Sequence, residues 1–540
     1  MIFIVITILT LLFCNFFKTK KSLHMLQQNL YNENNRYLKW VKKNFRQLFS
    51  FDVFSLFLSL ITLLVTYDLE KINHLLFILM SFFYLITTFV LYKKMKKEKT
   101  KKPLVITKRI QRLLVPIFVL FLIPILFIYF NNGNQFIILI SMTVLSIMTF
   151  LNWLIIFIAN IINYPVERMV YHYFKRKAKK KLASMNHLKI VGITGSYGKT
   201  SSKNILSDIL NIRYIAKPTP KNLNTYYGLM ITVNNHLDKF DDIFIAEMGA
   251  YVRGDIKGLC DLVNPKYGIL TTIGTAHLES FGSEENIVKA KFELIESLPE
   301  DGIGILNRDD KKQVNYNLNT KARILWIGID EKDVDVRAEN IKCSYKGTTF
   351  DVIFKNDSNK YSFETKLLGK HNVYNILASI ALGREFGIAI SELKQAVKMV
   401  KPVEHRLELK KLGSFYQIDD AYNSNPVGAK SALEVLNMMP GTKIVVTPGM
   451  IELGEKENEY NMQFGEQIKE VADADYVILI GKKKTKPIYD GLKNKGYDMD
   501  KVTIMNDVRE AYPFIQGLTN NGDDIYALFE NDLPDTYNEE

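Results

Sequence analysis

The sequence predicts an α-helical membrane anchor followed by an α/β protein, which consists of a P-loop domain and a Rossmann-like C-terminal domain. Three observations predict this fold class: long apolar runs near the N-terminus, a strand–glycine turn–helix pattern near residue 195, and alternating strand and helix patterns after Pro402. At 540 residues the chain is too long for one hydrophobic core. We expect a membrane domain at 1–162, a basic cytoplasmic linker at 163–182, a central domain at 183–402 and a C-terminal domain at 403–540.

Charge is distributed unevenly along the chain. Residues 1–181 hold 26 Lys+Arg against 6 Asp+Glu, and subtraction from the totals of 70 and 57 leaves 44 against 51 for residues 182–540. The net charge of +13 therefore reflects a basic membrane-proximal part joined to a mildly acidic remainder, and we expect no nucleic-acid partner. Cys14, Cys260 and Cys343 form no CxxC pattern, which excludes a disulfide scaffold and a cysteine-based zinc ribbon. The oligomeric state stays open.

Five apolar runs predict about five transmembrane helices, at 1–17, 51–67, 74–92, 113–130 and 135–162. In the first run the charges follow the apolar residues, so we expect a retained anchor instead of a signal peptide. The last run, 135–162, either spans the bilayer as a tilted helix or bends near Asn152 and lies partly along the membrane surface. No ionisable residue lies deep inside a run, which favours a plain anchor over a transporter, with a lipid-substrate binding surface as the alternative.

The loops between these runs predict the orientation. Loops 18–50, 93–112 and 163–181 carry eight, ten and seven Lys/Arg, whereas loops 68–73 and 131–134 are short and nearly neutral. By the positive-inside rule the N-terminus lies outside and everything after residue 163 is cytoplasmic. We therefore expect a multi-pass protein of the cell membrane, with membrane lipids among its partners.

A phosphate-binding loop is predicted at the start of the soluble part. The apolar run LKIVGIT (188–194) reads as a buried strand, and it leads through G-S-Y-G-K-T-S into the helical pattern SKNILSDIL. Glycines let backbone N–H groups surround phosphates, and a helix N-terminus adds positive potential. The spacing departs from the general G-x4-G-K-[ST] pattern, because Ile193 stands where the first glycine would fall. We expect the nucleotide to be held by Gly195, Ser196, Gly198, Lys199, Thr200 and Ser201.

Three more side chains lie at positions where they could belong either to an active site or to the ordinary structure of the domain. Glu247 ends the strand pattern at 242–250, where it can bind a metal in the crevice of a parallel sheet or be a solvated strand end. His277 lies in the turn after the next strand pattern and by itself fits a structural histidine. Lys291 lies on the helical pattern at 289–298 and by itself fits a surface lysine.

Taken in order, the motifs resemble the Mur ligase family over about residues 186–460. They are T-G-S-Y-G-K-T, E-M-G-A (247–250), G-T-A-H-L-E-S-F-G (274–282), A-K-F-E (290–293), L-N-R-D-D (306–310), L-G-K-H-N-V-Y-N (368–375), E-H-R-L-E (404–408) and D-D-A-Y-N-S-N-P (419–426). The last motif and K-N-L-N-T at 221–225 are most similar to the branch that adds D-alanyl-D-alanine to UDP-N-acetylmuramoyl-tripeptide. Residues 331–366 read as a β-rich insertion, and 441–449 and 474–481 as strands of the C-terminal domain.

The resemblance implies ATP and two Mg²⁺ ions as cofactors. Lys199 and Thr200 would hold the phosphates and the first ion, while Glu247 and His277 would surround a paired metal site. Lys291 matches a lysine that is carbamylated by CO₂ in this family, which turns a cation into a carboxylate-like metal ligand. The implied catalytic residues are Lys199, Glu247, His277 and Lys291, and the implied metal ligands are Thr200, Glu247, His277 and Lys291.

Further nucleotide and substrate contacts are implied by the same resemblance. Asn307 would contact the adenine, Arg406 a phosphate and Asp420 the ribose. His371 and Asn372 would line the nucleotide or interdomain cleft, or else cap a helix N-terminus. The implied substrate-binding residues are Asn222, Asn224, Thr225, Tyr422, Asn423 and Asn425.

The implied activity is an ATP-dependent, ADP-forming amide ligase of peptidoglycan precursor synthesis that works through an acyl phosphate. Its partners would be a carboxylate-bearing wall precursor and an amino acid or dipeptide. However, membrane helices occupy the place of the UDP-sugar domain, and residues 522–540 lack the lysine-glycine-serine-arginine pattern expected near the dipeptide site. Two alternatives stay open: a membrane-bound ligase for a lipid-linked or polymeric envelope carboxylate, and a catalytically inactive ATP-binding membrane scaffold.

Overall fold

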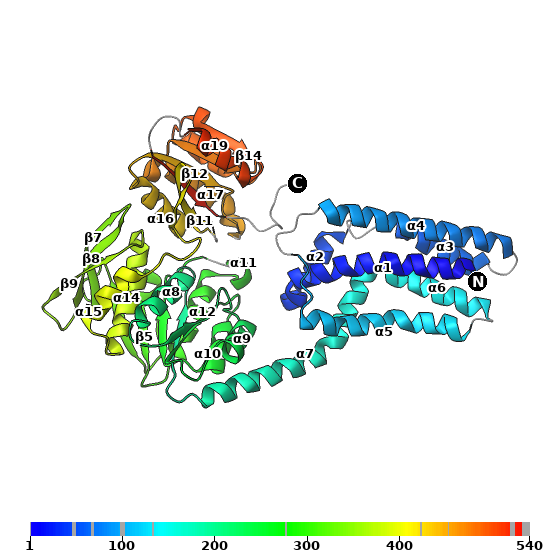
Figure 1. The fold of residues 1–540 in the computed structure, drawn as a ribbon, viewed down its shortest axis with the longest axis horizontal. Helices are drawn as coiled ribbons and strands as arrows, with labels where there is room; N and C mark the ends of the chain where they lie inside the picture. The colour runs from blue at the N-terminus through cyan, green and yellow to red at the C-terminus, as the bar shows by residue number, and fades with distance from the viewer. Residues whose placement is uncertain are drawn as a thin grey trace. The chain divides into compact units, whose positions relative to one another are not determined.

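The chain forms two compact units, Met1–Tyr173 and Phe174–Glu540 (Figure 1). The computed structural model describes residues 2–45, 50–65, 70–97, 103–131, 134–275, 278–421, 424–451, 453–518 and 524–531. The predicted site residues His277, Tyr422 and Asn423 lie outside these ranges.

The first unit is helical. Its helices are α1 (Ile2–Gln28), α2 (Arg36–Lys43), α3 (Asp52–Val65), α4 (Glu70–Lys97), α5 (Lys108–Phe130), α6 (Gln135–Phe150) and α7 (Asn152–Ala183). Among the described residues, four segments are long and apolar enough to cross a membrane: Ile2–Gln28, His74–Lys96, Lys108–Phe130 and Asn152–Ala183. The apolar helices Asp52–Leu64, in the predicted run at 51–67, and Gln135–Phe150 are shorter. The predicted run at 135–162 is divided at Leu151 into α6 and α7, in line with the expected bend near Asn152. The predicted linker is the helical second part of α7.

One expectation about the first unit needs correction. Lys18, predicted in a basic loop, lies on α1, where it forms an ion pair with Asp52 of α3, and both side chains are buried. Lys18 Nζ also donates to the carbonyl of Thr149, 3.2 Å away on α6. This pair arises only when three helices pack together, so no single apolar run could reveal it. A buried pair of this kind depends on both partners, because either charge alone would be costly.

The second unit begins with a nine-stranded sheet in the order β2-β3-β1-β4-β5-β6-β7-β8-β9. Strands β1 to β7 pair in parallel, whereas β7, β8 and β9 pair antiparallel and correspond to the predicted β-rich insertion. The strands are β1 (Lys189–Thr194), β2 (Ala216–Pro218), β3 (Ile243–Glu247), β4 (Tyr267–Leu270), β5 (Ile303–Asn307), β6 (Arg323–Gly328), β7 (Val336–Ser344), β8 (Gly347–Phe354) and β9 (Lys360–Thr365).

Helices cover both faces of this sheet (Figure 1). On one face α8 (Lys199–Leu210), α14 (Lys370–Glu385) and α15 (Ile390–Met399) share one hydrophobic core with the strands. On the other face α12 (Glu284–Glu296) packs so closely that a Cβ on Gly192 of β1 would lie 2.5 Å from a methyl group of Leu294. The remaining helices are α9 (Tyr226–Asn235), α10 (Asp255–Val263), α11 (Leu278–Phe281), α12 (Glu284–Glu296) and α13 (Lys311–Val314). Parallel strands with helices on both faces place the strand C-termini at one ligand-binding edge.

The C-terminal part is a six-stranded sheet in the order β10-β11-β15-β12-β13-β14. Only β10 and β11 pair antiparallel, and the other neighbours are parallel, as expected for a Rossmann-like sheet. Its elements are β10 (Glu408–Leu412), β11 (Phe415–Asp420), α16 (Pro426–Asn437), β12 (Thr442–Thr447), α17 (Glu457–Gln467), β13 (Tyr476–Ile480), α18 (Lys486–Asn494), β14 (Val502–Met505), α19 (Ala511–Leu518) and β15 (Ile525–Glu530). Helices α16, α17 and α18 share one core with the sheet, while α19 packs into a second core.

Candidate active site

The glycine loop between β1 and α8 has the backbone shape of a phosphate cradle. Gly195 and Gly198 adopt φ values of 152° and 79°, which side chains rarely allow. A Cβ on Gly195 would lie 1.9 Å from Thr271 Oγ1, so only glycine fits there. Lys199, the first residue of α8, curls back to donate to the carbonyls of Gly195 (2.6 Å) and Ser196 (3.1 Å). Burial lowers the pKa of Lys199 to about 8.

The side chain of Glu247 contacts three other side chains of the site. It ends β3, next to β1, and its side chain is 2% exposed. Its oxygens accept from Thr200 Oγ1 (3.2 Å to each) and from Asn224 Nδ2 (3.0 Å), and Lys203 Nζ lies 3.0 Å from Oε2. The carboxylate therefore faces one ammonium and two neutral donors at the strand end. Carboxylate and hydroxyl oxygens are also the donor types that Mg²⁺ accepts.

Lys291 lies in an environment unlike that of a surface lysine. Its side chain on α12 is buried, with the ammonium 5.5 Å from the ring centre of Phe281. The charges that act on its ammonium are those of Lys199, Asp255 and Glu293. Burial, followed by the charge of Lys199, lowers the pKa of Lys291 well below its ordinary value. A buried lysine of this kind favours the neutral amine, which is the form that reacts with CO₂.

The C-terminal part contributes charge to the same region. Arg406 lies near enough to lower the pKa of both Lys199 and His371, after the larger effect of burial on each. Burial lowers the pKa of His371 to about 4, and its Nδ1 has no hydrogen-bond partner among the described residues. Arg406 also counteracts the effect of burial on Asp420, whose pKa burial raises to about 6. Four predicted nucleotide-site residues thus meet in one charged region.

Other predicted residues have local structural roles. Thr225 accepts from the N–H of Gly228 to cap α9, and Asn425 accepts from Gly428 to cap α16. Asn307 Oδ1 accepts from the N–H of Asp309 in the turn after β5, so its amide nitrogen is the group left for an adenine contact. Asn222 is exposed, whereas the backbone and amide of Asn224 bind Gly249 and Glu247. Ser201 lies in the first turn of α8, beside Thr200.

The pair His371 and Asn372 does not cap a helix. Gly369 occupies the N-cap position of α14, and no side chain caps it. Asn372 Nδ2 instead donates to the carbonyl of Leu368, 2.9 Å away. The helix-cap interpretation is therefore wrong for both residues.

Sequence reasoning missed three residues. Lys203 lies one helical turn after Lys199, so its spacing could have placed it on the same face of α8. Thr271 Oγ1 lies 2.6 Å from the carbonyl of Tyr197 and fixes the glycine loop. Glu530 ends β15 after the apolar run IYALF (525–529), and its burial could not be read from the acidic and polar residues that follow it.

The metal site has few candidate ligands. Across the described part of the chain, no three His, Cys, Asp or Glu side chains lie together in an arrangement that could hold a metal. Of the expected ligands, Thr200 and Glu247 are in contact, and Lys291 is buried near Lys199.

Comparison with known families matches residues 193–383 to the Mur ligase middle domain and residues 405–528 to the Mur ligase glutamate ligase domain. Two relatives are named UDP-N-acetylmuramoyl-tripeptide–D-alanyl-D-alanine ligase. The Bacillus subtilis (strain 168) protein is 34% identical over 281 residues, which are 51% of this chain and 59% of that protein. The Escherichia coli (strain K12) protein is 32% identical over 296 residues, which are 54% of this chain and 65% of that protein. The chain thus spans under two thirds of their lengths.

Solved structures show the same fold. MurF from Acinetobacter baumannii aligns with a TM-score of 0.60 at 24% identity, over 67% of this chain and 77% of that one. MurF ligase from Thermotoga maritima, in complex with ADP, aligns with a TM-score of 0.58 at 26% identity, over 67% of this chain and 80% of that one. The two matched domains together cover most of the second unit, and they contain the glycine loop, Glu247, Lys291 and Arg406. Through these middle and C-terminal domains, the chain belongs to the Mur ligase family.

Proposed function

We propose that the protein is an ATP-dependent, ADP-forming ligase that joins an amine to the carboxylate of a cell-wall precursor. The reaction that we propose first is the addition of D-alanyl-D-alanine to UDP-N-acetylmuramoyl-tripeptide, because that is the activity in the names of the relatives. The observation that carries the proposal is the convergence of Lys199 and Thr200 of the glycine loop with Glu247 and the buried Lys291.

The residues fit a nucleoside triphosphate. The cradle at Gly195 and Gly198 has no room for a Cβ at its first position, and Lys199 is held over the loop carbonyls. A phosphate in the cradle would offer Lys199 a stronger acceptor than these carbonyls, since hydrogen bonds between ionised groups are about twice as strong as neutral ones. The likeness to a Thermotoga maritima ligase in complex with ADP supports the same assignment.

The residues also fit Mg²⁺. Thr200 and Glu247 supply adjacent hydroxyl and carboxylate oxygens, which are the hard donors that this ion prefers. When bound, two Mg²⁺ ions would neutralise charge that develops on the transferring phosphoryl group. Carbamylation of Lys291 would place a carboxylate at the buried end of this side chain, and the lowered pKa of Lys291 favours that reaction.

The chain's own groups would then do three things. Lys199 would stabilise the phosphoryl group as it moves from ATP to the acceptor carboxylate. Arg406, near both Lys199 and Asp420, would add positive charge from the C-terminal domain. Closure of the C-terminal domain would exclude water from the acyl phosphate until an amine attacks it and phosphate leaves.

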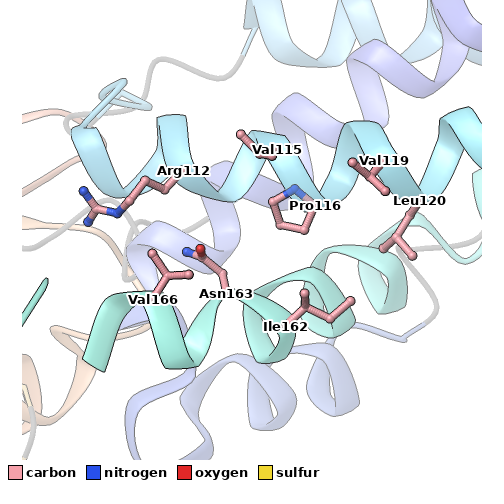
Figure 2. Close-up of a pocket in the computed structure, with 8 residues that line it drawn as sticks. All are labelled: Arg112, Val115, Pro116, Val119, Leu120, Ile162, Asn163 and Val166. Carbon is pink, nitrogen blue, oxygen red and sulfur yellow. The ribbon is translucent and has the colours of Figure 1, made fainter. Parts of the chain in front are cut away.

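A second acceptor is favoured by the first unit. Membrane-length helices take the place that a UDP-sugar domain would occupy, so a lipid-linked or polymeric carboxylate is the alternative substrate. Figure 2 shows a groove in this unit that is lined by α5 and α7. Its walls are apolar except for Asn163 and for Arg112 at one end, where Arg112 pairs with Glu167 through two hydrogen bonds of 2.7 and 2.8 Å. A lipid with a polar head group matches this pattern.

The proposed location follows from the same helices. We propose a multi-pass protein of the cell membrane, with its N-terminus outside and its ligase domains in the cytoplasm, where ATP is available. Protease protection in membrane vesicles of known orientation tests this arrangement. Cleavage of the ligase domains only when the cytoplasmic face is exposed would support it, and cleavage from the outer face would contradict it.

The test of the function is product analysis with the full-length protein in detergent. Mg-ATP, UDP-N-acetylmuramoyl-tripeptide and D-alanyl-D-alanine should yield ADP and one new amide, identified by mass spectrometry. Turnover only with a membrane extract would instead identify the lipid-linked or polymeric acceptor. ATP binding without turnover in either mixture would contradict the proposal and leave a scaffold role.

A further inference from the structure

A buried ammonium group connects Glu247 to the segment that precedes α9. This segment, residues 219–225, lies between β2 and α9, and we call it the substrate segment. It contains the predicted substrate-binding residues Asn222, Asn224 and Thr225. Lys203 Nζ lies 3.0 Å from Glu247 Oε2 and donates to the carbonyl of Lys221 at 2.7 Å. We call these two contacts the Lys203 bridge, and the side chains of Lys203 and Glu247 are each only 2% exposed.

The ends of the substrate segment are held by β3 and by the residues that follow it. Thr219 Oγ1 accepts from the N–H of Glu247 (3.2 Å), and Asn224 Nδ2 donates to Glu247 Oε1 (3.0 Å). The carbonyl of Asn224 accepts from the N–H of Gly249 at 2.8 Å, and a Cβ on Gly249 would lie 3.0 Å from Asn224 Cγ. Between these two ends, the hydrogen bond from Lys203 reaches the middle of the segment.

The middle of the substrate segment has a strained backbone. Lys221 has a φ of 48°, in the left-handed region, which costs free energy for a residue that carries a Cβ. Its side chain is exposed, so packing of that side chain gives little in return. Strained conformations persist where the surrounding contacts hold them, and they are common at functional sites. The hydrogen bond from the charged Lys203 to the Lys221 carbonyl is a contact of this kind.

The Lys203 bridge keeps two parts of the proposed reaction together. Glu247 and Thr200 supply the oxygens that fit Mg²⁺, so the position of Glu247 determines where the metal binds. The substrate segment carries side chains that we propose for the acceptor. A misplacement of about 1 Å can cost about 10²-fold in rate, so a contact that fixes both parts supports the chemistry without touching it. An ammonium that only neutralised Glu247 would explain the ion pair but not the contact with Lys221.

We propose that Lys203 is a positioning residue that holds the substrate segment against Glu247, so that the metal-binding carboxylate and the acceptor-binding segment keep a fixed separation. This inference rests on the proposed ligase function and deepens it by naming a residue that acts through others. Loss of the Lys203 bridge should weaken binding of the acceptor more than binding of ATP, because the glycine loop holds the phosphates by separate contacts.

The first test needs no substrate. Hydrogen exchange is followed by mass spectrometry on the full-length protein in detergent. In the wild type, we expect peptides that cover residues 219–225 to exchange at least about tenfold more slowly than an unfolded chain. Lys203→Met removes both contacts and should speed exchange there by about tenfold, with no change in β1 or α10. An unprotected segment in the wild type, unchanged exchange in the variant or equal acceleration throughout the domain would overturn the inference.

Two further variants control this experiment. Lys239→Met makes the same substitution at an exposed lysine after α9 and should leave exchange of the substrate segment as in the wild type. Lys203→Gln keeps an N–H donor on a shorter side chain and should give an intermediate rate. If Lys203→Met does not fold, Lys203→Gln decides in its place. A Lys203→Gln protein that also fails to fold would make Lys203 a structural residue and overturn its positioning role.

Kinetics then connect the Lys203 bridge to function. With D-alanyl-D-alanine as the amine, Lys203→Met should raise KM for UDP-N-acetylmuramoyl-tripeptide by about tenfold and change KM for ATP by no more than about twofold. Where turnover is too slow, dissociation constants from calorimetry with a non-hydrolysable ATP analogue replace KM. A merely structural residue would lower the amount of active protein without this difference. Equal effects on the two substrates, or no effect on either, would contradict the inference.

The exchange experiment also separates the two proposals. If the wild-type protein does not turn over this acceptor, local loss of protection in Lys203→Met would still support the Lys203 bridge and count against the proposed function alone. Turnover by the wild type together with unchanged exchange in Lys203→Met would leave the function intact and overturn the inference.

Discussion

The two sheets of the second unit both place carboxylates at the ends of parallel strands, but they surround them differently. Glu247, at the end of β3, faces the ammonium of Lys203 and donors from Thr200 and Asn224. Glu530, at the end of β15, faces Ser424 and a second acid, Asp420. The first arrangement is prepared for a cation among phosphates. The second holds protons, because burial raises the pKa of both acids, so equivalent strand ends in the two sheets keep a carboxyl group in opposite charge states.

The largest expected effect tests the glycine-loop side of this comparison. Lys199→Ala should lower ADP formation by about 10³-fold, since a charge aimed at the transferring phosphoryl group is removed. Steady-state ADP production measures it. Lys266→Ala, an exposed lysine paired with Asp301, is the matched control and should retain wild-type activity. Unchanged turnover in Lys199→Ala would remove the glycine loop from the mechanism.

Lys291→Ala should cost on the order of 10²-fold in activity, because the carboxylate-like ligand can no longer form. Acetate or propionate in solution should restore part of the rate by occupying the same space. Lys289→Ala, two residues away on the exposed side of α12, serves as the control. Full activity of Lys291→Ala without added carboxylate would show that the residue is not a metal ligand.

Glu247→Gln should destabilise the protein as well as inactivate it. It leaves the buried ammonium of Lys203 without its counter-charge, which typically costs about 3–5 kcal/mol. The midpoint of thermal unfolding should fall clearly in this variant. Glu285→Gln, which breaks an exposed pair with Lys289, should leave the midpoint unchanged. A Glu247→Gln protein as stable as the wild type would mean that the Lys203 pair contributes little.

The smallest effect concerns the acid pair of the C-terminal sheet. Burial raises the pKa of Asp420 from 3.8 to about 6, so the folded state binds more protons than the unfolded chain between these values. Stability should therefore fall as the pH rises through this window. Glu530→Gln removes one member of the pair and should flatten the fall. Thermal unfolding midpoints from pH 4 to pH 7 measure it, and identical profiles for variant and wild type would argue against the coupling.

Sequence patterns were sufficient for the parts of the fold that depend on local signals. The strand–glycine loop–helix unit, the β-rich insertion and the strands at 441–449 and 474–481 occur where they were expected. The Mur ligase resemblance is confirmed by both domain matches. Each of these features is encoded within one short segment, through apolar periodicity or glycine spacing.

Features that need packing between distant segments were not predictable. The Lys18–Asp52 pair joins two helices, Lys203 binds a carboxylate 44 positions later, and Glu530 meets Asp420 across a strand pair. Each of these side chains is unremarkable in its own segment, and its environment arises only from the tertiary fold. Thr225 and Asn425 cap helices through N–H groups three residues further along the chain. Their predicted substrate contacts stay a prediction, since capping and substrate binding use the same polar residue types.

The most direct test of the central claim follows the oxygen atoms of the acceptor. UDP-N-acetylmuramoyl-tripeptide labelled with ¹⁸O in its terminal carboxylate is incubated with the full-length protein, Mg-ATP and D-alanyl-D-alanine, and the released phosphate is analysed by mass spectrometry. A ligase that works through an acyl phosphate transfers one ¹⁸O to each phosphate, with no transfer in Lys199→Ala. Unlabelled phosphate alongside a new amide would contradict the acyl-phosphate mechanism.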